Sequence, residues 1–437
     1  MSIRIRLFVM MILEFFIWGA WLPLIFSYLP SLGFSATEQS WILSAFPIAA
    51  IAGMFFSNQF ADRNFAAERF MAASHLIGGL AMLSLAWTRS FWPFFIAMLV
   101  HCLLYVPTLS IVNSIAFAHM KDSQKEFGFV RMGGTLGWIL AAWPMTFILV
   151  DWDRVNAAGS SGFVGWVGTV LASGLTGAAL QSATKWTFVV AGVASLLLSA
   201  FSLSLPHTPP KPATGANRFA WLEAMRLLAT PFILVLWLVT FVDSTVHNLF
   251  FNWTGTFLGT ASAAGGVGIP GNWIMPVMSI GQVAEMSTML ILGVTLKKLG
   301  WRMTMIIGIL GHAARFAVFA FLPQYREVVV LVNLLHGICY AFFFATVYIF
   351  VDEFFPTDVR SSAQGLFNLM ILGAGPLVAN ILGPRLIGET FNHAGRVDFR
   401  SLFLVPCAAA IVAAVALALF FHPPRQPVRR DAADVAA

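Results

Sequence analysis

Charged residues and cysteines are both scarce in this sequence, and each shortage excludes a class of protein. Asp, Glu, Lys and Arg make up only 10% of the 437 residues, whereas a soluble domain carries about 25%, so a soluble fold is excluded. The three cysteines, Cys102, Cys339 and Cys407, stand apart in apolar segments, which argues against a disulfide framework and a zinc site. The sequence also lacks HExxH, GxSxG and paired His-acid ligand spacings, so neither an enzyme nor a cofactor is expected.

Apolar residues take the place of the missing charge, because 59% of the sequence is hydrophobic. They gather in twelve stretches, each near the roughly 20 residues with which a helix crosses a bilayer. We therefore predict an all-α membrane protein with twelve transmembrane helices, at about residues 6–29, 36–59, 70–88, 91–119, 128–150, 186–205, 229–258, 273–296, 302–323, 327–350, 361–387 and 400–421.

One uncharged stretch, Gly159 to Leu180, could be taken for a thirteenth span. It is dense in Gly, Ser and Thr, and charged residues flank it at Asp151, Asp153 and Lys185. We therefore predict a long outer loop over residues 151–185, with an interfacial helix.

Lysine and arginine fall unevenly on the two sides of the predicted membrane. Sixteen of the 25 lie in loops on one side and seven on the other, while Arg131 and Arg315 lie inside spans. Cytoplasmic loops carry the positive excess, so both termini are predicted to be cytoplasmic. Membrane orientation thus explains the net charge of +6, and no nucleic-acid partner is expected.

A proline-rich stretch from Pro206 to Arg226 separates six spans from six, because proline cannot continue a helix. It predicts an N-terminal bundle (1–206), a cytoplasmic linker (207–227), a C-terminal bundle (228–423) and a cytoplasmic tail (424–437). The loop holding Asp62 and Arg63 and the loop from Gly293 to Arg302 resemble the signature loops of the major facilitator superfamily. That resemblance implies a substrate site at mid-membrane between two six-helix bundles.

An arginine inside a span, Arg131, is the strongest indication of function. A charge within the membrane marks a functional site by default. Thr135 and Trp138 follow at i+4 and i+7, so one helical face presents a guanidinium, a hydroxyl and a large aromatic ring. This face suits a flat, polar solute.

Further polar pairs occur at helical spacing in the second half. They share a face within each pair and could bind a solute or join helices to one another: Gln282 with Glu285, Thr245 with Asn248, and His336 with Tyr340.

Read in order, the polar residues of the spans form a series of short motifs. The series comprises Glu14 to Trp21, Tyr105 to Asn113, Arg131 to Trp138, Asn248, Gln282 to Glu285, Ala314 to Ala317 and Arg360 to Gly365. This series resembles that of the bacterial nucleoside:proton symporter family. The resemblance implies a secondary transporter of the bacterial cytoplasmic membrane that moves nucleosides by alternating access and works as a single chain in the lipid bilayer.

The resemblance also implies which residues bind the nucleoside. These are Arg131, Thr135, Trp138, Thr245, Asn248, Gln282, Glu285, His336 and Tyr340. An uncoupled facilitator, a carrier for another small polar solute such as a sugar, and a receptor that does not transport are the alternatives.

Proton coupling needs an acid, and the family's acid in the tenth span is replaced here by Ala341. Glu285, Glu14 and Asp243 are the remaining candidates within spans. We favour proton-coupled uptake with Glu285 as the coupling acid and Glu14 assisting. Glu14 could instead be a buried acid hydrogen-bonded to another helix.

The other notable charges are expected to have structural or gating roles. Arg315 is expected to pair with an acid or to cap carbonyl groups inside the second half. Asp62, Arg63 and Arg360 are expected to join the cytoplasmic ends of neighbouring helices.

Overall fold

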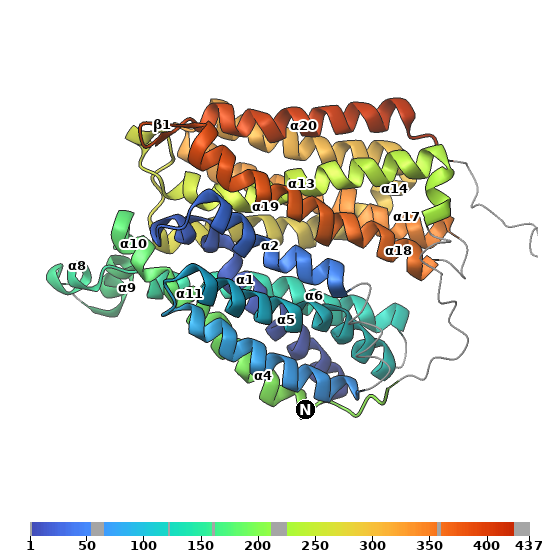
Figure 1. The fold of residues 1–437 in the computed structure, drawn as a ribbon, viewed down its shortest axis with the longest axis horizontal. Helices are drawn as coiled ribbons and strands as arrows, with labels where there is room; N and C mark the ends of the chain where they lie inside the picture. The colour runs from blue at the N-terminus through green and yellow to red at the C-terminus, as the bar shows by residue number, and fades with distance from the viewer. Residues whose placement is uncertain are drawn as a thin grey trace, which may run out of the picture.

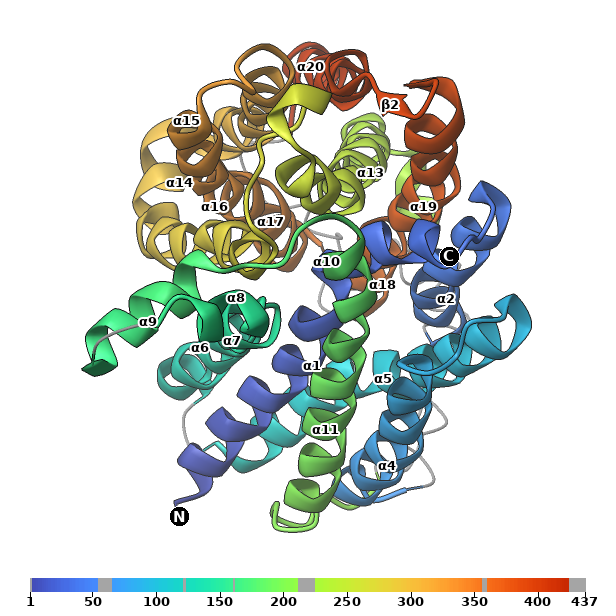
Figure 2. The ribbon, with the colours of Figure 1, turned by 90° about the vertical axis from the view of Figure 1, so that its left-hand side faces the viewer.

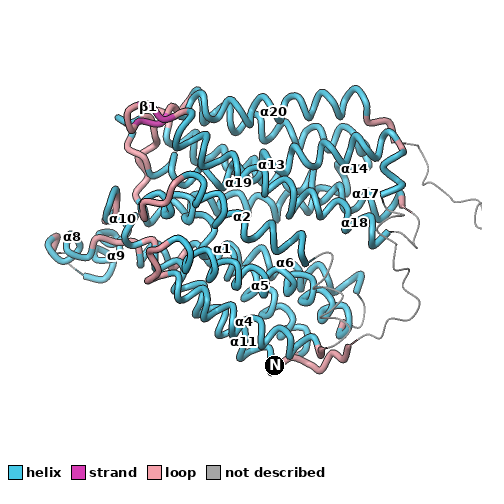
Figure 3. The backbone as a smooth tube through the Cα atoms, viewed as in Figure 1, coloured by secondary structure: helices cyan, strands magenta, loops and turns pink. Residues whose placement is uncertain are grey.

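The computed structural model describes residues 2–53, 65–120, 123–159, 162–210, 225–355 and 360–423. Helix dominates throughout these residues (Figure 3). The only strands in them are the two residues each of β1 (Asn392–His393) and β2 (Arg396–Val397), which pair as an antiparallel hairpin. The prediction of an all-α protein is therefore confirmed.

The helices form two groups that lie side by side (Figure 1). The first group contains α1 (Ile3–Ser31), α2 (Ala36–Ala52), α4 (Ala67–Leu85), α5 (Phe91–His119), α6 (Ser123–Ala142) and α11 (Lys185–Ser202). The second contains α13 (Pro231–Gly259), α14 (Gly271–Phe321), α15 (Arg326–Leu331), α16 (Leu335–Cys339), α17 (Thr346–Phe354), α18 (Arg360–Asn368), α19 (Gly375–Arg385) and α20 (Phe399–Phe420). Short 3₁₀ and π-helical turns extend or join these helices at η2 (Leu227–Ala229), η3 (Ser262–Ala264), η4 (Val332–Leu334), η5 (Tyr340–Ala345), η6 (Leu369–Ala374) and η7 (Leu386–Thr390).

The long helix α14 contains two of the predicted spans. Its backbone breaks at Gly300, where φ is +71°, a conformation that glycine adopts without steric cost. Eight helical stretches of the described chain, α14 counted once, are long and apolar enough to cross a membrane. The three remaining predicted spans correspond to α2, α4 and α6, which brings the total to the twelve expected.

The predicted outer loop forms short helices at one end of the molecule (Figure 1). They are α8 (Trp152–Ala157), α9 (Gly162–Ala172) and α10 (Gly177–Ala183), and the short α7 (Met145–Ile148) precedes them at the end of the predicted fifth span. The longest, α9, has 11 residues, a length of about 16 Å at 1.5 Å per residue, and cannot cross a bilayer core of about 30 Å. This segment is therefore not a thirteenth span, although it holds more helix than the single interfacial one expected.

Close contact between α1 and α6 determines which way the face of α6 that carries Arg131 is turned. A Cβ atom added at Gly137 would collide with the backbone carbonyl of Ile12, and one added at Gly133 would lie 2.7 Å from the carbonyl oxygen of Phe8. Small residues permit such close approach of membrane helices. With the glycine face turned toward α1, the polar residues of α6 reach the space between the two groups of helices.

Candidate functional site

A cavity of about 790 Å³ lies between the two groups of helices. Its wall is formed by α1, α2, α5 and α6 from the first half and by α13, α14, α16, η5, α17, α18, η6 and α19 from the second. The volume falls within the roughly 300–1,000 Å³ typical of small-molecule sites. Both halves therefore contribute to one site.

The predicted α6 face forms part of this wall. Arg131, Thr135 and Trp138 all line the cavity. The guanidinium carbon of Arg131 lies 4.5 Å from the ring centroid of Phe15, and none of the ion pairs among the described residues includes Arg131. Trp138 meets Phe251 of the other half with 6.0 Å between ring centroids. This wall offers a cation beside an aromatic surface.

The second half contributes most of its predicted polar residues to the same cavity, namely Asn248, Gln282, Glu285, His336 and Tyr340. The Glu285 carboxylate has no hydrogen-bond partner among the described residues, but it interacts electrostatically with Arg131. Glu285 is the only acid, and Arg131 the only lysine or arginine, among the described residues of the wall. A solute between the two halves thus meets one anion and one cation.

Thr245 is the one predicted binding residue that does not line the cavity. Its hydroxyl donates to the backbone carbonyl of Phe241 at 2.9 Å. Ser244 and His247, on either side of it in the sequence, line the cavity instead. The rotation of α13 about its axis determines which of its residues face the cavity. The spacing of polar residues in the sequence does not reveal that rotation.

At the end of the molecule that carries α8 to α10 (Figure 2), no described residue of these three helices lines the cavity. There the outer segment binds the start of α14: the Gly271 amide donates to the Leu175 carbonyl at 2.8 Å, and the Trp273 indole donates to the Leu171 carbonyl at 2.8 Å. Toward the opposite end the wall continues to Phe117 near the end of α5 and to Gln364 of α18. The cavity therefore extends toward the side predicted to be cytoplasmic.

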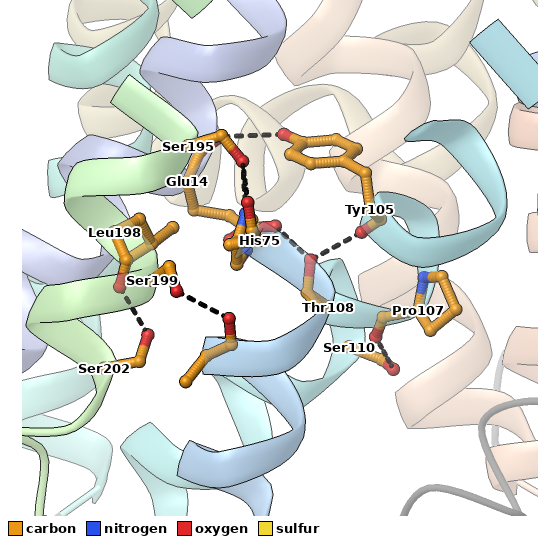
Figure 4. Close-up of polar contacts among 11 residues, drawn as sticks. Glu14, His75, Tyr105, Pro107, Thr108, Ser110, Ser195, Leu198, Ser199 and Ser202 are labelled. Atoms are coloured by element: carbon orange, nitrogen blue, oxygen red, sulfur yellow. Dashed lines mark hydrogen bonds and ion pairs between the residues drawn. The ribbon is translucent and has the colours of Figure 1, made fainter. Parts of the chain in front are cut away.

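Glu14 does not line the cavity and lies inside the first group of helices (Figure 4). Its carboxylate is 3.0 Å from His75 Nε2 of α4 and accepts a hydrogen bond from the Thr108 hydroxyl of α5 at 2.7 Å. Ser195 of α11 lies 3.1 Å from the other nitrogen of His75. The alternative considered for Glu14, a buried acid bonded to other helices, is what the structure contains.

Asp243 and Arg315 are likewise buried away from the cavity, inside the second half. A carboxylate oxygen of Asp243 lies 3.6 Å from His312 Nε2. Arg315 lies 3.0 Å from His312 Nδ1 and 3.0 Å from His336 Nδ1, and its guanidinium carbon is 3.8 Å from the Phe250 ring centroid. Among the described residues, Arg315 therefore reaches Asp243 through His312 and is hydrogen-bonded to the cavity wall through His336.

Three of the predicted gating charges lie wholly or partly outside the described residues. Asp62 and Arg63 lie outside the described residues, and Arg360 begins α18 with a side chain that is also outside the description.

Several polar residues of the wall were not among the predicted binding residues. Asn380 is the most connected, because it contacts Asn248 and the other half of the chain. Tyr348 and Asn368 also line the cavity, and the Tyr348 hydroxyl donates to Asn368 at 2.5 Å. Both residues lie in spans that contain few polar residues. This scarcity is the one feature of the sequence that could have marked them as candidate binding residues.

Comparison with known proteins agrees with this architecture. A family model described as nucleoside H+ symporter matches residues 1–161 and 150–426. The putative nucleoside transporter YegT of Escherichia coli K12 is 30% identical over 97% of this chain and 94% of its own. The xanthosine permease of the same organism is 27% identical over 95% of both chains.

Solved structures show the same fold. The crystal structure of the nucleoside transporter NupG matches with a TM-score of 0.78 at 23% identity, covering 97% of this chain and 100% of that one. A D-xylose-proton symporter matches with a TM-score of 0.66 at 15% identity, over 96% and 98%. Both are transporters, and the twelve-helix fold is that of the major facilitator superfamily. The chain therefore belongs to the nucleoside H+ symporter family and is a multi-pass membrane transporter.

Proposed function

We propose that this transporter carries nucleosides into the cytoplasm together with protons, and that the solute binds between Arg131 and Glu285. The observation that carries the proposal is the shared cavity, in which these two residues are the sole charged members of the described wall and come from opposite halves. A solute that touches both can hold the halves together and favour their rearrangement.

The lining suits a nucleoside, which combines a flat base with a hydroxyl-bearing sugar. Trp138 and Tyr340 offer aromatic faces, and stacking contributes about 1–3 kcal/mol per base. Thr135, Asn248 and Gln282 offer hydrogen-bonding groups at the same cavity. A ligand that lacks a matching hydroxyl leaves such groups unpaired, which weakens its binding.

Glu285 is the residue we assign to proton coupling. A coupling acid must be reached by protons and by the solute, and the carboxylate of Glu285 lies in the cavity wall while those of Glu14 and Asp243 do not. Protonation of Glu285 removes the negative charge that faces Arg131. The proton and the solute can therefore each change how strongly the two halves attract.

Alternating access supplies the movement. At the end that carries α8 to α10 the outer segment is hydrogen-bonded to the start of α14, and the described cavity wall reaches Phe117 and Gln364 toward the other end. We assign that other end to the cytoplasm because both termini and the positive loops are predicted there. In this assignment the structure is the inward-facing state of a single chain in the inner membrane.

The proposal is tested with purified protein in liposomes. Wild-type protein should accumulate radiolabelled uridine when the outside is acidic. Glu285→Gln should lose accumulation but keep exchange of internal for external uridine, because exchange needs no net proton movement. Arg131→Ala should lose both activities, because it removes the cation of the site.

Matched controls are available on the exposed start of α15. Glu327→Gln and Arg326→Ala change the same residue types at exposed positions and should leave uptake unchanged. Wild-type uptake in Arg131→Ala would refute the site. Uridine entry without proton movement in the wild type would leave the site intact and identify an uncoupled facilitator, and competition by D-xylose but not by nucleosides would reject the substrate class.

A further inference from the structure

Two buried asparagines surround the amide of Asn248. Asn248 and Asn252 lie one turn apart on α13, and Asn380 lies on α19. Asn252 and Asn380 are 4% and 5% exposed, whereas Asn248 is half-buried in the cavity wall. The Asn248 side-chain nitrogen lies 2.8 Å from Asn380 Oδ1 and 3.4 Å from Asn252 Oδ1.

The orientation of the Asn380 amide follows from its other partner. Asn380 Nδ2 donates to the backbone carbonyl of Leu43 at 2.8 Å. A carbonyl oxygen can only accept a hydrogen bond, so the nitrogen of Asn380 must face Leu43. The oxygen of Asn380 is thereby turned toward Asn248.

Asn252 is oriented in the same way by an independent carbonyl. Its Nδ2 donates to the backbone carbonyl of Ala379 at 3.1 Å, which leaves its oxygen to face Asn248. A primary amide nitrogen carries two hydrogens, and the Asn248 side-chain nitrogen has two acceptor oxygens, one from Asn380 and one from Asn252. Both hydrogens of Asn248 are therefore used, and its oxygen is the polar atom that remains for a solute.

We propose that Asn252 and Asn380 are positioning residues that hold Asn248 as a hydrogen-bond acceptor, so that the transporter selects nucleosides offering an N–H or O–H donor at this point. This inference rests on the proposed function, because it takes the solute to be a nucleoside bound in the cavity. It adds a chemical requirement that the cavity's shape does not impose. The donors available on uridine are the base N3–H and the 2′-, 3′- and 5′-hydroxyl groups.

The orienting carbonyl of Leu43 belongs to α2, on the other half of the chain. Close by, the Ser40 hydroxyl of α2 donates to the Ile381 carbonyl of α19 at 3.2 Å. The amide of Asn380 thus holds its orientation while α2 and α19 are in contact. The selection of a donor is therefore tied to contact between the two halves.

A competition experiment tests the inference. Uptake of radiolabelled uridine is inhibited with 3-methyluridine and with 2′-, 3′- and 5′-deoxyuridine, each of which lacks one donor. In the wild type, one of these analogues should inhibit about tenfold or more weakly than uridine, as expected when an acceptor is left unpaired. The ratio of inhibition constants does not depend on how much protein is made.

The decisive variant is Asn252→Leu combined with Asn380→Leu, which frees the Asn248 amide to turn either of its ends to the solute. The ratio for that analogue should fall to about twofold. Asn333→Leu is the matched control, because Asn333 is buried, does not line the cavity and has hydrogen bonds only to backbone carbonyls in the part of the chain that the structure describes. Its ratio should stay near tenfold.

The ratio of inhibition constants distinguishes a positioning role from a structural one, because a general loss of stability would not change it. If the double variant is absent from membranes, Asn380→Leu alone retains the longer Asn252 contact and should give an intermediate ratio. An unchanged ratio in an active variant, or equal inhibition by all analogues in the wild type, would overturn the inference while leaving nucleoside transport intact. Absence of uridine uptake by the wild type would instead overturn the proposed function, and this inference with it.

Discussion

Replacement of Asp243 by asparagine should destabilise the protein strongly. Asp243 and Arg315 are both 0% exposed, and removal of one partner of a buried charge pair costs about 3–5 kcal/mol because the other charge is left uncompensated. Among the described residues, Arg315 has hydrogen bonds only with His312 and His336 and stacks on aromatic rings, so no second acid offsets the cost. We expect Asp243→Asn to lower the free energy of unfolding by this amount.

Asp243 and Arg315 leave several hydrogen-bonding atoms without partners in the described chain, and a prediction for the double variant follows from this. Both carboxylate oxygens of Asp243 and the Nε atom of Arg315 lack hydrogen-bond partners among the described residues. Replacement of an entire buried ion pair by neutral residues is often neutral or stabilising. The double variant Asp243→Asn with Arg315→Met should therefore be more stable than either single variant.

Unfolding of the purified protein by increasing sodium dodecyl sulfate, followed by circular dichroism, measures these differences. His312→Phe, which removes the connecting ring nitrogens but neither charge, separates loss of the bridge from loss of charge and should cost less than Asp243→Asn. Single-variant losses that simply add in the double variant would show that the two charges do not interact. The charge-pair reasoning would then be wrong.

Three further predictions concern single positions. Glu14→Gln should lower stability by about 1–3 kcal/mol through its weakened bond to His75, with proton-driven uptake retained, which the same unfolding assay and a flux assay would show. Gly137→Leu should collide with the backbone of α1 and cost at least about 1–3 kcal/mol, measured as a lower unfolding midpoint. Glu68 lies in the first turn of α4, before the predicted span at 70–88. Its burial acts to raise the pKa, but hydrogen bonds, chiefly from the Thr208 amide at 2.9 Å, outweigh this and lower the pKa below its usual 4.5. This carboxylate therefore stabilises the fold above that pH, the contribution is lost as pH falls through the lower folded pKa, and acid titration of Glu68→Gln should lack that loss.

The sequence predicted the site best where a single helix carries it. Arg131, Thr135 and Trp138 share a face by spacing alone, and all three line the cavity. The twelve spans were likewise predictable, because membrane thickness fixes their length. Spacing within one helix, however, does not say which way that helix is turned, and so Thr245 was expected in a wall that Ser244 occupies.

Contacts between distant segments could not be predicted in this way. Glu14 meets His75, 61 residues away, and Asn248 meets Asn380, 132 residues away. Each pair depends on how the helices pack around one another, and hydropathy carries no information on that order. The roles of Glu14 and Asn380 therefore became visible only with the fold.

The composition of the cavity wall bears on how large a concentration gradient the membrane potential alone can support. Under the proposed function, with Glu285 as the coupling acid and the one acid in the described wall, a cycle moves one proton with an uncharged nucleoside, and hence one positive charge. A membrane potential of about 100 mV supplies about 2.3 kcal/mol per elementary charge, which corresponds to roughly a 50-fold concentration ratio at about 1.4 kcal/mol per tenfold. A bacterium that relies on this protein can thus scavenge nucleosides against a gradient of that order before any contribution from the pH difference.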